Sequence, residues 1–427
     1  MRHATFLGST TLTTVTLWLI VISAIPSSAS PYHNNIKHVY RDTMRPNSVF
    51  MAESIIERGQ GLGLKNDDEP SINYEHGTFQ HALWNLYRYT NNDTYLYLIK
   101  EAIDHIVTPA GKVVGEYDPE AYSLDNIRVM ESMIHLWQLT KEEKYKIAAG
   151  ELQNQMKTQP RTAEGAFWHK DKYVQQQWLD GIYMAHYSYA LYATTFEPDT
   201  AEEVFKDIEL QFSLVWKHCR DNKTGLLRHG YDYSKRQVWA DPITGASPEV
   251  WDRALGWYFM SLIELLSPTS PIPRTHPAST TLLSQLRALT PALLRNADPT
   301  TGAWFLVMSQ PGDRKGNYIE SSGTVMFIYT LLKALRLSLV DDTDGTILKA
   351  ARKAYEYILK EMIWIEDGEM MMRGTVKVGS LKSNGTFEYY TSIPTEINDL
   401  KGTGPFVMAS LEYERLNDIA KGDIQQR

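Results

Sequence analysis

The sequence predicts an all-α fold, an (α/α)6 toroid in which six helical hairpins form a ring. The first observation is a carboxylate that opens an apolar helical stripe five times, at intervals of about 50 to 70 residues, a period typical of repeat architectures. The second is that an amphipathic segment follows each stripe, which gives every unit two helices and a loop. Such units must stack to cover their apolar faces, and six of them can close into a ring. An open superhelix is the alternative.

The clearest stripe starts at Asp180. Tyr183, Met184, Tyr187 and Leu191 follow it at i+3, i+4, i+7 and i+11, so they lie on its face of a helix. The other inner helices are predicted to start at Glu75, Asp125, Asp252, Glu320 and, more weakly, near Lys401. The outer helices are predicted over 93–107, 142–156, 200–218, 280–296 and 345–362, with one further helix over 47–59 at the amino end.

Two segments outside the hairpins are assigned by their composition. Residues 374–394 alternate apolar and polar residues around Asn384-Gly385, which predicts a small β-hairpin beside the ring. Residues 267–280 are rich in proline and small residues but lie inside one repeat, so they form a surface loop. No linker divides the chain, and residues 30–427 are predicted to form a single catalytic domain.

The amino terminus has the pattern of a secretory signal peptide. A basic start, an apolar core over 15–25 and a small-residue exit predict a signal over residues 1–29 and a secreted, extracellular protein. Asn92, Asn222 and Asn384 open glycosylation triplets, which count only if the export route is eukaryotic. Cys219 is the single cysteine, so the fold has no internal disulfide.

Composition and motifs exclude several classes of function. A net charge of −8 argues against nucleic acid or an anionic membrane as a partner. The sequence has no zinc-binding spacing, phosphate loop or dinucleotide fingerprint, so we predict neither a metal nor a cofactor. Aspartate is rarely buried without a partner or a chemical task, and closing the ring would gather the helix-opening carboxylates at one end. The sequence therefore predicts an acidic cleft around Asp180.

Several motifs, in order over roughly residues 45 to 415, carry a family resemblance. The chain resembles the unsaturated rhamnogalacturonyl hydrolases of glycoside hydrolase family 105 and, more distantly, the unsaturated glucuronyl hydrolases. The matching segments are Tyr74-Glu75-x-Gly77, Tyr122-Ser123-Leu124-Asp125-Asn126, Phe167-Trp168-His169-Lys170, Gln177 to Ala185, Leu227-Arg228-His229-Gly230-Tyr231-Asp232, Trp251-x-Arg253-x-x-Gly256-Trp257-Tyr258 and Lys401-Gly402-Thr403-Gly404. One departure is Ala254, where the family often has glycine, and alanine is nearly as small.

The resemblance implies a six-hairpin toroid and an unusual hydrolysis of small pectin-derived oligosaccharides. Water adds across the C4=C5 double bond of an unsaturated galacturonyl residue, and the hemiketal so formed opens and releases rhamnose. By position Asp180 is the acid that gives and then accepts a proton, with Asp125 as its orienting partner. Because both are carboxylates and Asp180 is expected to be buried, we expect Asp180 to hold a proton near working pH. The residues expected to bind substrate are His169, Lys170, His229, Trp251, Arg253 and Trp257.

Two other classes stay open. One is a different sugar enzyme on the same toroid, either an unsaturated glucuronyl hydrolase or an inverting glycosidase. The second is a non-catalytic glycan-binding protein with a decayed site. Against it argues the joint presence of Asp125, His169, Lys170, Asp180, His229 and Arg253.

Overall fold

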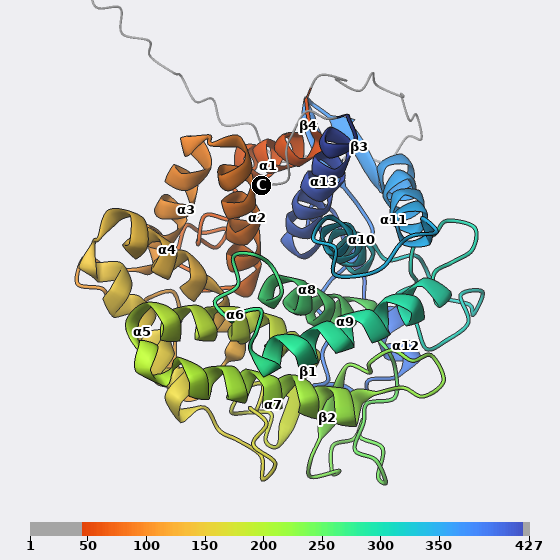
Figure 1. The fold of residues 1–427 in the computed structure, drawn as a ribbon, viewed down its shortest axis with the longest axis horizontal. Coiled ribbons are helices and arrows are strands. Elements are labelled where there is room, and N and C mark those ends of the chain that lie inside the picture. Colours follow the sequence, from red (N-terminus) through yellow and green to blue (C-terminus); the bar gives the residue numbers. More distant parts are fainter. Residues whose placement is uncertain (1–44, 422–427) are drawn as a thin grey trace, which may run out of the picture. The chain divides into compact units, whose positions relative to one another are not determined.

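The computed structural model describes residues 45–421, and within them the inner helices form a closed ring. These helices are α2 (Tyr74–Thr90), α4 (Met130–Thr140), α6 (Leu179–Phe196), α8 (Asp252–Leu265), α10 (Ser321–Arg336) and α13 (Leu400–Lys421). Each contacts the next, and α13 contacts α2 (Figure 1). The toroid is therefore confirmed and the open superhelix is excluded.

The signal segment over 1–29 lies outside the described residues. None of the helices described is both long and apolar enough to cross a bilayer.

The outer helices surround this ring. They are α3 (Asp93–Ile106), α5 (Glu143–Thr158), α7 (Ala201–Cys219), α9 (Pro277–Arg295) and α11 (Thr346–Tyr357), and each contacts the inner helix that precedes it in the chain. The amino-terminal helix α1 (Asn47–Glu57) contacts α13, and the Ser48 backbone N–H donates to Glu414 Oε1 at 3.0 Å. The two ends of the described chain thus complete the sixth hairpin together.

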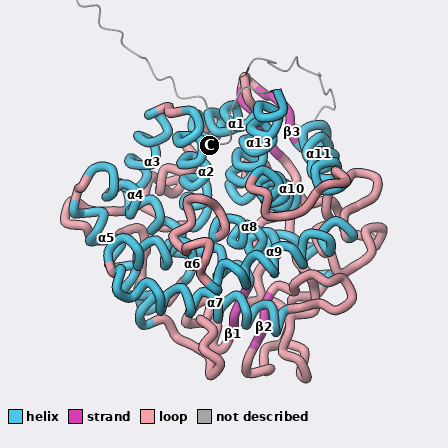
Figure 2. The backbone as a smooth tube through the Cα atoms, viewed as in Figure 1, coloured by secondary structure: helices cyan, strands magenta, loops and turns pink. Residues whose placement is uncertain are grey.

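The described strands are short and lie in the loops (Figure 2). Three antiparallel pairs are present: β1 (Gln176–Trp178) with β2 (Gly230–Asp232), β3 (Ile363–Glu366) with β4 (Glu369–Met372), and β5 (Thr375–Val376) with β6 (Thr395–Glu396). The last pair closes the segment over 374–394, but Asn384-Gly385 forms no hairpin turn. Instead the Thr386 hydroxyl accepts the Tyr389 N–H and caps the short helix α12 (Phe387–Ser392).

Backbone hydrogen bonds fix the end of the ring where the inner helices begin. An N–H at or just before each of four inner helices donates to a carbonyl of the loop that precedes the next inner helix. The pairs, donor first, are Leu124 and His169, Leu179 and His229, Asp252 and Leu306, and Ser321 and Gly374, at 3.0 to 3.2 Å. These bonds hold the loop that carries His169 against the turn that leads into α4. They hold the loop that carries His229 against the start of α6.

Two of the helix-opening carboxylates, Glu75 and Glu320, tie structural elements together, and a third, Asp252, is buried beside Glu320. Glu75 accepts a hydrogen bond from Lys401 Nζ at 2.8 Å, which links the starts of α2 and α13. Glu320 accepts the Gly323 N–H at 2.7 Å and the Val376 N–H at 2.9 Å, so it caps α10 and holds β5. Burial and the nearby Glu320 charge raise the pKa of Asp252 well above its usual range.

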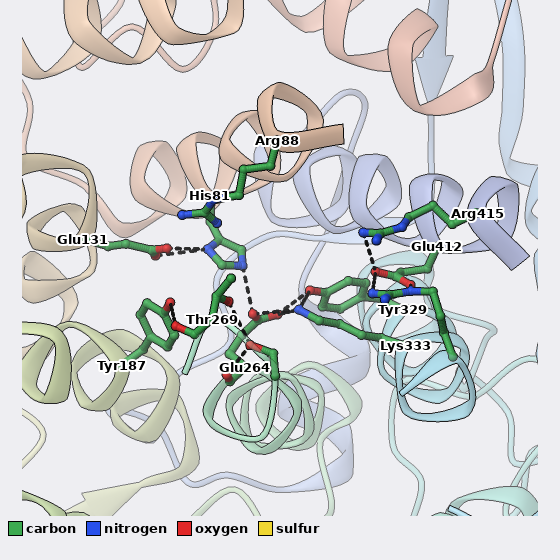
Figure 3. A network of polar contacts seen from close by, with 12 residues as sticks. His81, Arg88, Glu131, Tyr187, Glu264, Thr269, Tyr329, Lys333, Glu412 and Arg415 are labelled. Atoms are coloured by element: carbon green, nitrogen blue, oxygen red, sulfur yellow. Dashed lines mark hydrogen bonds and ion pairs between the residues drawn. The ribbon is translucent and has the colours of Figure 1, made fainter. Parts of the chain in front are cut away.

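A buried network of charges links the inner helices farther from these starts (Figure 3). Lys333 Nζ on α10 donates to Glu264 on α8 at 2.8 and 3.0 Å, and Tyr329 donates to the same carboxylate. His81 on α2 lies between two carboxylates, 3.3 Å from Glu264 and 2.9 Å from Glu131 on α4. Burial alone would raise the pKa of Glu264, but the charges of Lys333 and His81 lower it well below its usual range. One carboxylate thus connects three inner helices.

Candidate active site

Asp180 lies in the first turn of α6, directly after the strand β1 that pairs with the loop before α8. Its side chain is 15% exposed, and its Oδ2 lies 3.0 Å from His229 Nε2. Burial raises the pKa of Asp180, but the opposing influence of His229, reinforced by His169, is larger and leaves this pKa below its usual range. Asp180 is therefore ionised at neutral pH in this structure.

This result corrects the expectation that Asp180 holds a proton near working pH. That expectation assumed Asp125 to be the charged neighbour with the strongest effect. In the structure Lys170 Nζ donates to Asp125 Oδ2 and forms an ion pair with it, and the basic ring of His229 faces Asp180 instead. Since an imidazole favours the charged form of a carboxyl group, the direction of the shift reverses.

The pair Asp125 and Lys170 forms a second polar group in the site. Asp125 lies in the 3-10 helix over 124–129 that leads into α4, rather than in an α-helix as predicted. The Asp125 side chain is 17% exposed and that of Lys170 is 22% exposed, so both are partly accessible. Burial would lower the pKa of Lys170, but Asp125 raises it, so the ammonium stays charged. His169 Nε2 lies 3.6 Å from Asp125, and burial lowers the pKa of this histidine to about 4.

Aromatic side chains hold the two histidines. The His169 ring stacks on Trp178 with centroids 4.6 Å apart, and Tyr173 stacks on the same indole at 4.4 Å. The His229 ring packs at a tilt against the Trp251 ring, with centroids 4.9 Å apart. We did not single out Trp178 or Tyr173 from the sequence, although Trp178 stands two residues before Asp180 in the matching motif. The position of Trp178 close to the candidate acid in the sequence could have indicated that it belongs to the site.

Five of the six predicted substrate-binding residues are buried in this structure, with 0 to 3% of each exposed: His169, His229, Trp251, Arg253 and Trp257. The Arg253 guanidinium donates to the Val376 carbonyl at 2.6 Å and to the Lys377 carbonyl, while Trp257 stacks on Tyr183. This geometry favours a role in holding the wall of the site. Direct contact with sugar stays a prediction for these five side chains and for Lys170.

Comparisons with known proteins place the chain in a family of sugar hydrolases. The model of Glycosyl Hydrolase Family 88 matches residues 48–417. The chain belongs to this family. A glycoside hydrolase of family 105 from C. acetobutylicum is 36% identical, with a TM-score of 0.80, and the match covers 87% of this chain and 100% of that one. The resemblance to family 105 is thereby confirmed.

Two further relatives mark the range of the similarity. The 24.9 kDa protein in the picA locus of Rhizobium radiobacter is 34% identical over 227 residues, which are 51% of this chain and 93% of that protein. An unsaturated glucuronyl hydrolase from Bacillus sp. GL1 is 13% identical, with a TM-score of 0.59, and the match covers 86% of this chain and 95% of that one. At this identity the Bacillus structure shows that the fold is shared.

The geometry limits what the hydrolase can do with its two accessible carboxyl groups. Asp180 faces an imidazole that can exchange a proton with it, whereas Asp125 is paired with an ammonium group. The residues described contain no group of three or more His, Cys, Asp or Glu side chains close enough to hold a metal ion. Asp180 beside the His229 imidazole is therefore the candidate acid–base group of the site, and it lies next to the ion pair of Asp125 and Lys170.

Proposed function

We propose that this hydrolase removes the unsaturated uronate from the non-reducing end of small oligosaccharides by hydrating its C4=C5 double bond. The observation that carries the proposal is the unequal state of the two carboxyl groups. Ordinary glycoside hydrolysis needs two carboxyl groups with complementary tasks. Here Asp125 forms an ion pair with Lys170, whereas Asp180 has no such cation and lies 3.0 Å from the His229 imidazole. Hydration of an alkene requires one such acid–base group.

The proposed reaction uses Asp180 twice. The protonated carboxyl group donates to C4, and positive charge develops on C5 and the ring oxygen. Water then attacks C5 while Asp180 accepts a proton from it, and the resulting hemiketal opens and releases the neighbouring sugar. Asp180 is ionised in this structure because His229 lowers its pKa. A bound uronate brings a negative charge into the site, and a like charge raises the pKa of a carboxyl group, so the substrate itself promotes the protonated form.

The finer proposal is that the substrate is unsaturated galacturonyl-rhamnose from lyase-degraded rhamnogalacturonan. The ordered motifs and the family 105 relative support it. The test measures turnover of this disaccharide beside unsaturated chondroitin disaccharide, by loss of the near-ultraviolet absorbance of the double bond. We expect the specificity constant for the rhamnoside to be at least about 10-fold higher, since a site built for one sugar leaves polar groups unpaired with another. Faster turnover of the chondroitin disaccharide would indicate a glucuronyl hydrolase, and no turnover of either would contradict the hydration proposal.

A further inference from the structure

A third residue extends the contact between Asp180 and His229. The Tyr390 hydroxyl lies 2.6 Å from His229 Nδ1, on the opposite side of the imidazole from Asp180. Tyr390 and His229 are both fully buried. His229 Nε2 and Asp180 Oδ2 are buried as well and lie 3.0 Å apart, and neither atom has a hydrogen-bond partner of normal geometry among the described residues. The imidazole therefore lies between the hydroxyl and the carboxylate.

The segment over 374–394 brings Tyr390 to this place, and several contacts fix it there. Arg253 holds the carbonyls of Val376 and Lys377. The backbone at Gly379 lies so close to the Trp251 indole that an added Cβ would be 2.8 Å from Cζ2. Tyr390 itself stacks on Trp251 with ring centroids 5.5 Å apart. Trp251 and Arg253 thus act together to hold the tyrosine against His229.

We propose that Tyr390 is a positioning residue that sets the tautomer of His229 and so places its Nε2–H beside Asp180. Burial raises the pKa of Tyr390 well above its usual range, so the hydroxyl keeps its proton and can donate it to Nδ1. With Nδ1 accepting, the proton of a neutral imidazole lies on Nε2, which is 3.0 Å from Asp180 Oδ2. This contact positions the carboxyl group and leaves its second oxygen to exchange a proton with the substrate. The inference rests on the proposed function for its meaning in catalysis.

Tyr390→Phe tests the inference because it keeps the ring on Trp251 and removes only the hydroxyl. We expect kcat to fall about 10-fold or more, with KM within about 3-fold, because the acid–base group loses its orientation while substrate contacts remain. A hydrogen bond donated to the neutral imidazole opposes its protonation, so its loss should also shift one limb of the pH profile of kcat. The matched control is Tyr389→Phe on the same short helix. It removes a hydroxyl that accepts the Ser380 N–H at 2.9 Å, and should leave kcat within about 2-fold since it does not contact His229.

A second measurement does not depend on turnover. Nitrogen-15 NMR of the histidine side chains reports which ring nitrogen carries the proton, and His229→Gln assigns the signal. We expect His229 to be protonated on Nε2 alone in the unaltered protein at pH 8, and to become a mixture of tautomers in Tyr390→Phe. An unchanged tautomer and pH profile in Tyr390→Phe, or an equal loss of kcat in Tyr389→Phe, would overturn the inference. If the unaltered protein turns over no unsaturated uronide, the proposed function fails while the tautomer result still decides the role of Tyr390.

Discussion

Asp180→Asn should lower turnover of an unsaturated uronide by about 10²–10⁴-fold or more, the usual contribution of a positioned general acid–base group. The amide is nearly the same size as the carboxyl group, so α6 and the ring should form as before. It can neither give a proton to C4 nor accept one from water. The rate of absorbance loss at saturating substrate measures the effect, and circular dichroism reports whether the helices are intact.

The control for this variant is the same substitution at an exposed position. Asp199 lies in the short turn before α7, is exposed and makes no side-chain hydrogen bond in the structure. Asp199→Asn should therefore keep normal turnover. An Asp180→Asn protein as active as the Asp199→Asn protein would remove Asp180 from the catalytic role.

Glu264→Gln should lower the free energy of unfolding by about 3–5 kcal/mol, because removing one partner of a buried charge network leaves the others uncompensated. Glu264 is the carboxylate that His81 and Lys333 share, and all three side chains are almost fully buried. The amide keeps the shape but not the negative charge, so two basic groups would face each other inside the ring. Urea unfolding at pH 7 measures the change.

The pH dependence of this loss provides a further check. The folded protein lowers the pKa of Glu264, so its stabilising contribution is fully present above the unfolded pKa of about 4.3, decreases below it, and is lost as pH falls through the lower folded pKa. The difference between the two proteins should therefore shrink in acid. Glu202→Gln, at a Glu that is 59% exposed and paired with Lys206, should leave stability nearly unchanged, because exposed ion pairs contribute little. Equal effects at the two positions would show that the buried network adds no stability.

The ring could be predicted from the sequence because it depends on local periodicity. Each apolar stripe and its opening carboxylate lie within a few turns of one helix, and the regular spacing shows the repeat. The pairing of α1 with α13 joins residues at opposite ends of the described chain, and no local pattern contains it. The same limit applies to the segment over 374–394, where strand alternation predicted a hairpin but the Thr386 cap favours α12.

The sequence predicted which residues belong to the candidate site, but not which side chains would pair with each other. The motifs contained Asp125, Lys170, Asp180 and His229, yet their pairing follows from backbone bonds such as Leu179 N–H to the His229 carbonyl, across 50 residues of chain. The direction of the Asp180 pKa shift was mispredicted because it depends on which side chain lies nearest, and that is His229 rather than Asp125. Tyr390 had no signal, since its role exists only once α12 lies against Trp251.

The hydration mechanism is tested most directly by isotope labels in the products. If Asp180 delivers a proton to C4, a reaction in heavy water must place deuterium on C4 of the uronate. If water attacks C5, oxygen-18 from labelled water must appear in the C5 carbonyl, and the released sugar must keep its bridging oxygen. Direct displacement at the anomeric carbon predicts oxygen-18 at C1 and an intact double bond. Label confined to C1, or cleavage of saturated galacturonyl-rhamnose at a comparable rate, would contradict hydration and favour an inverting glycosidase.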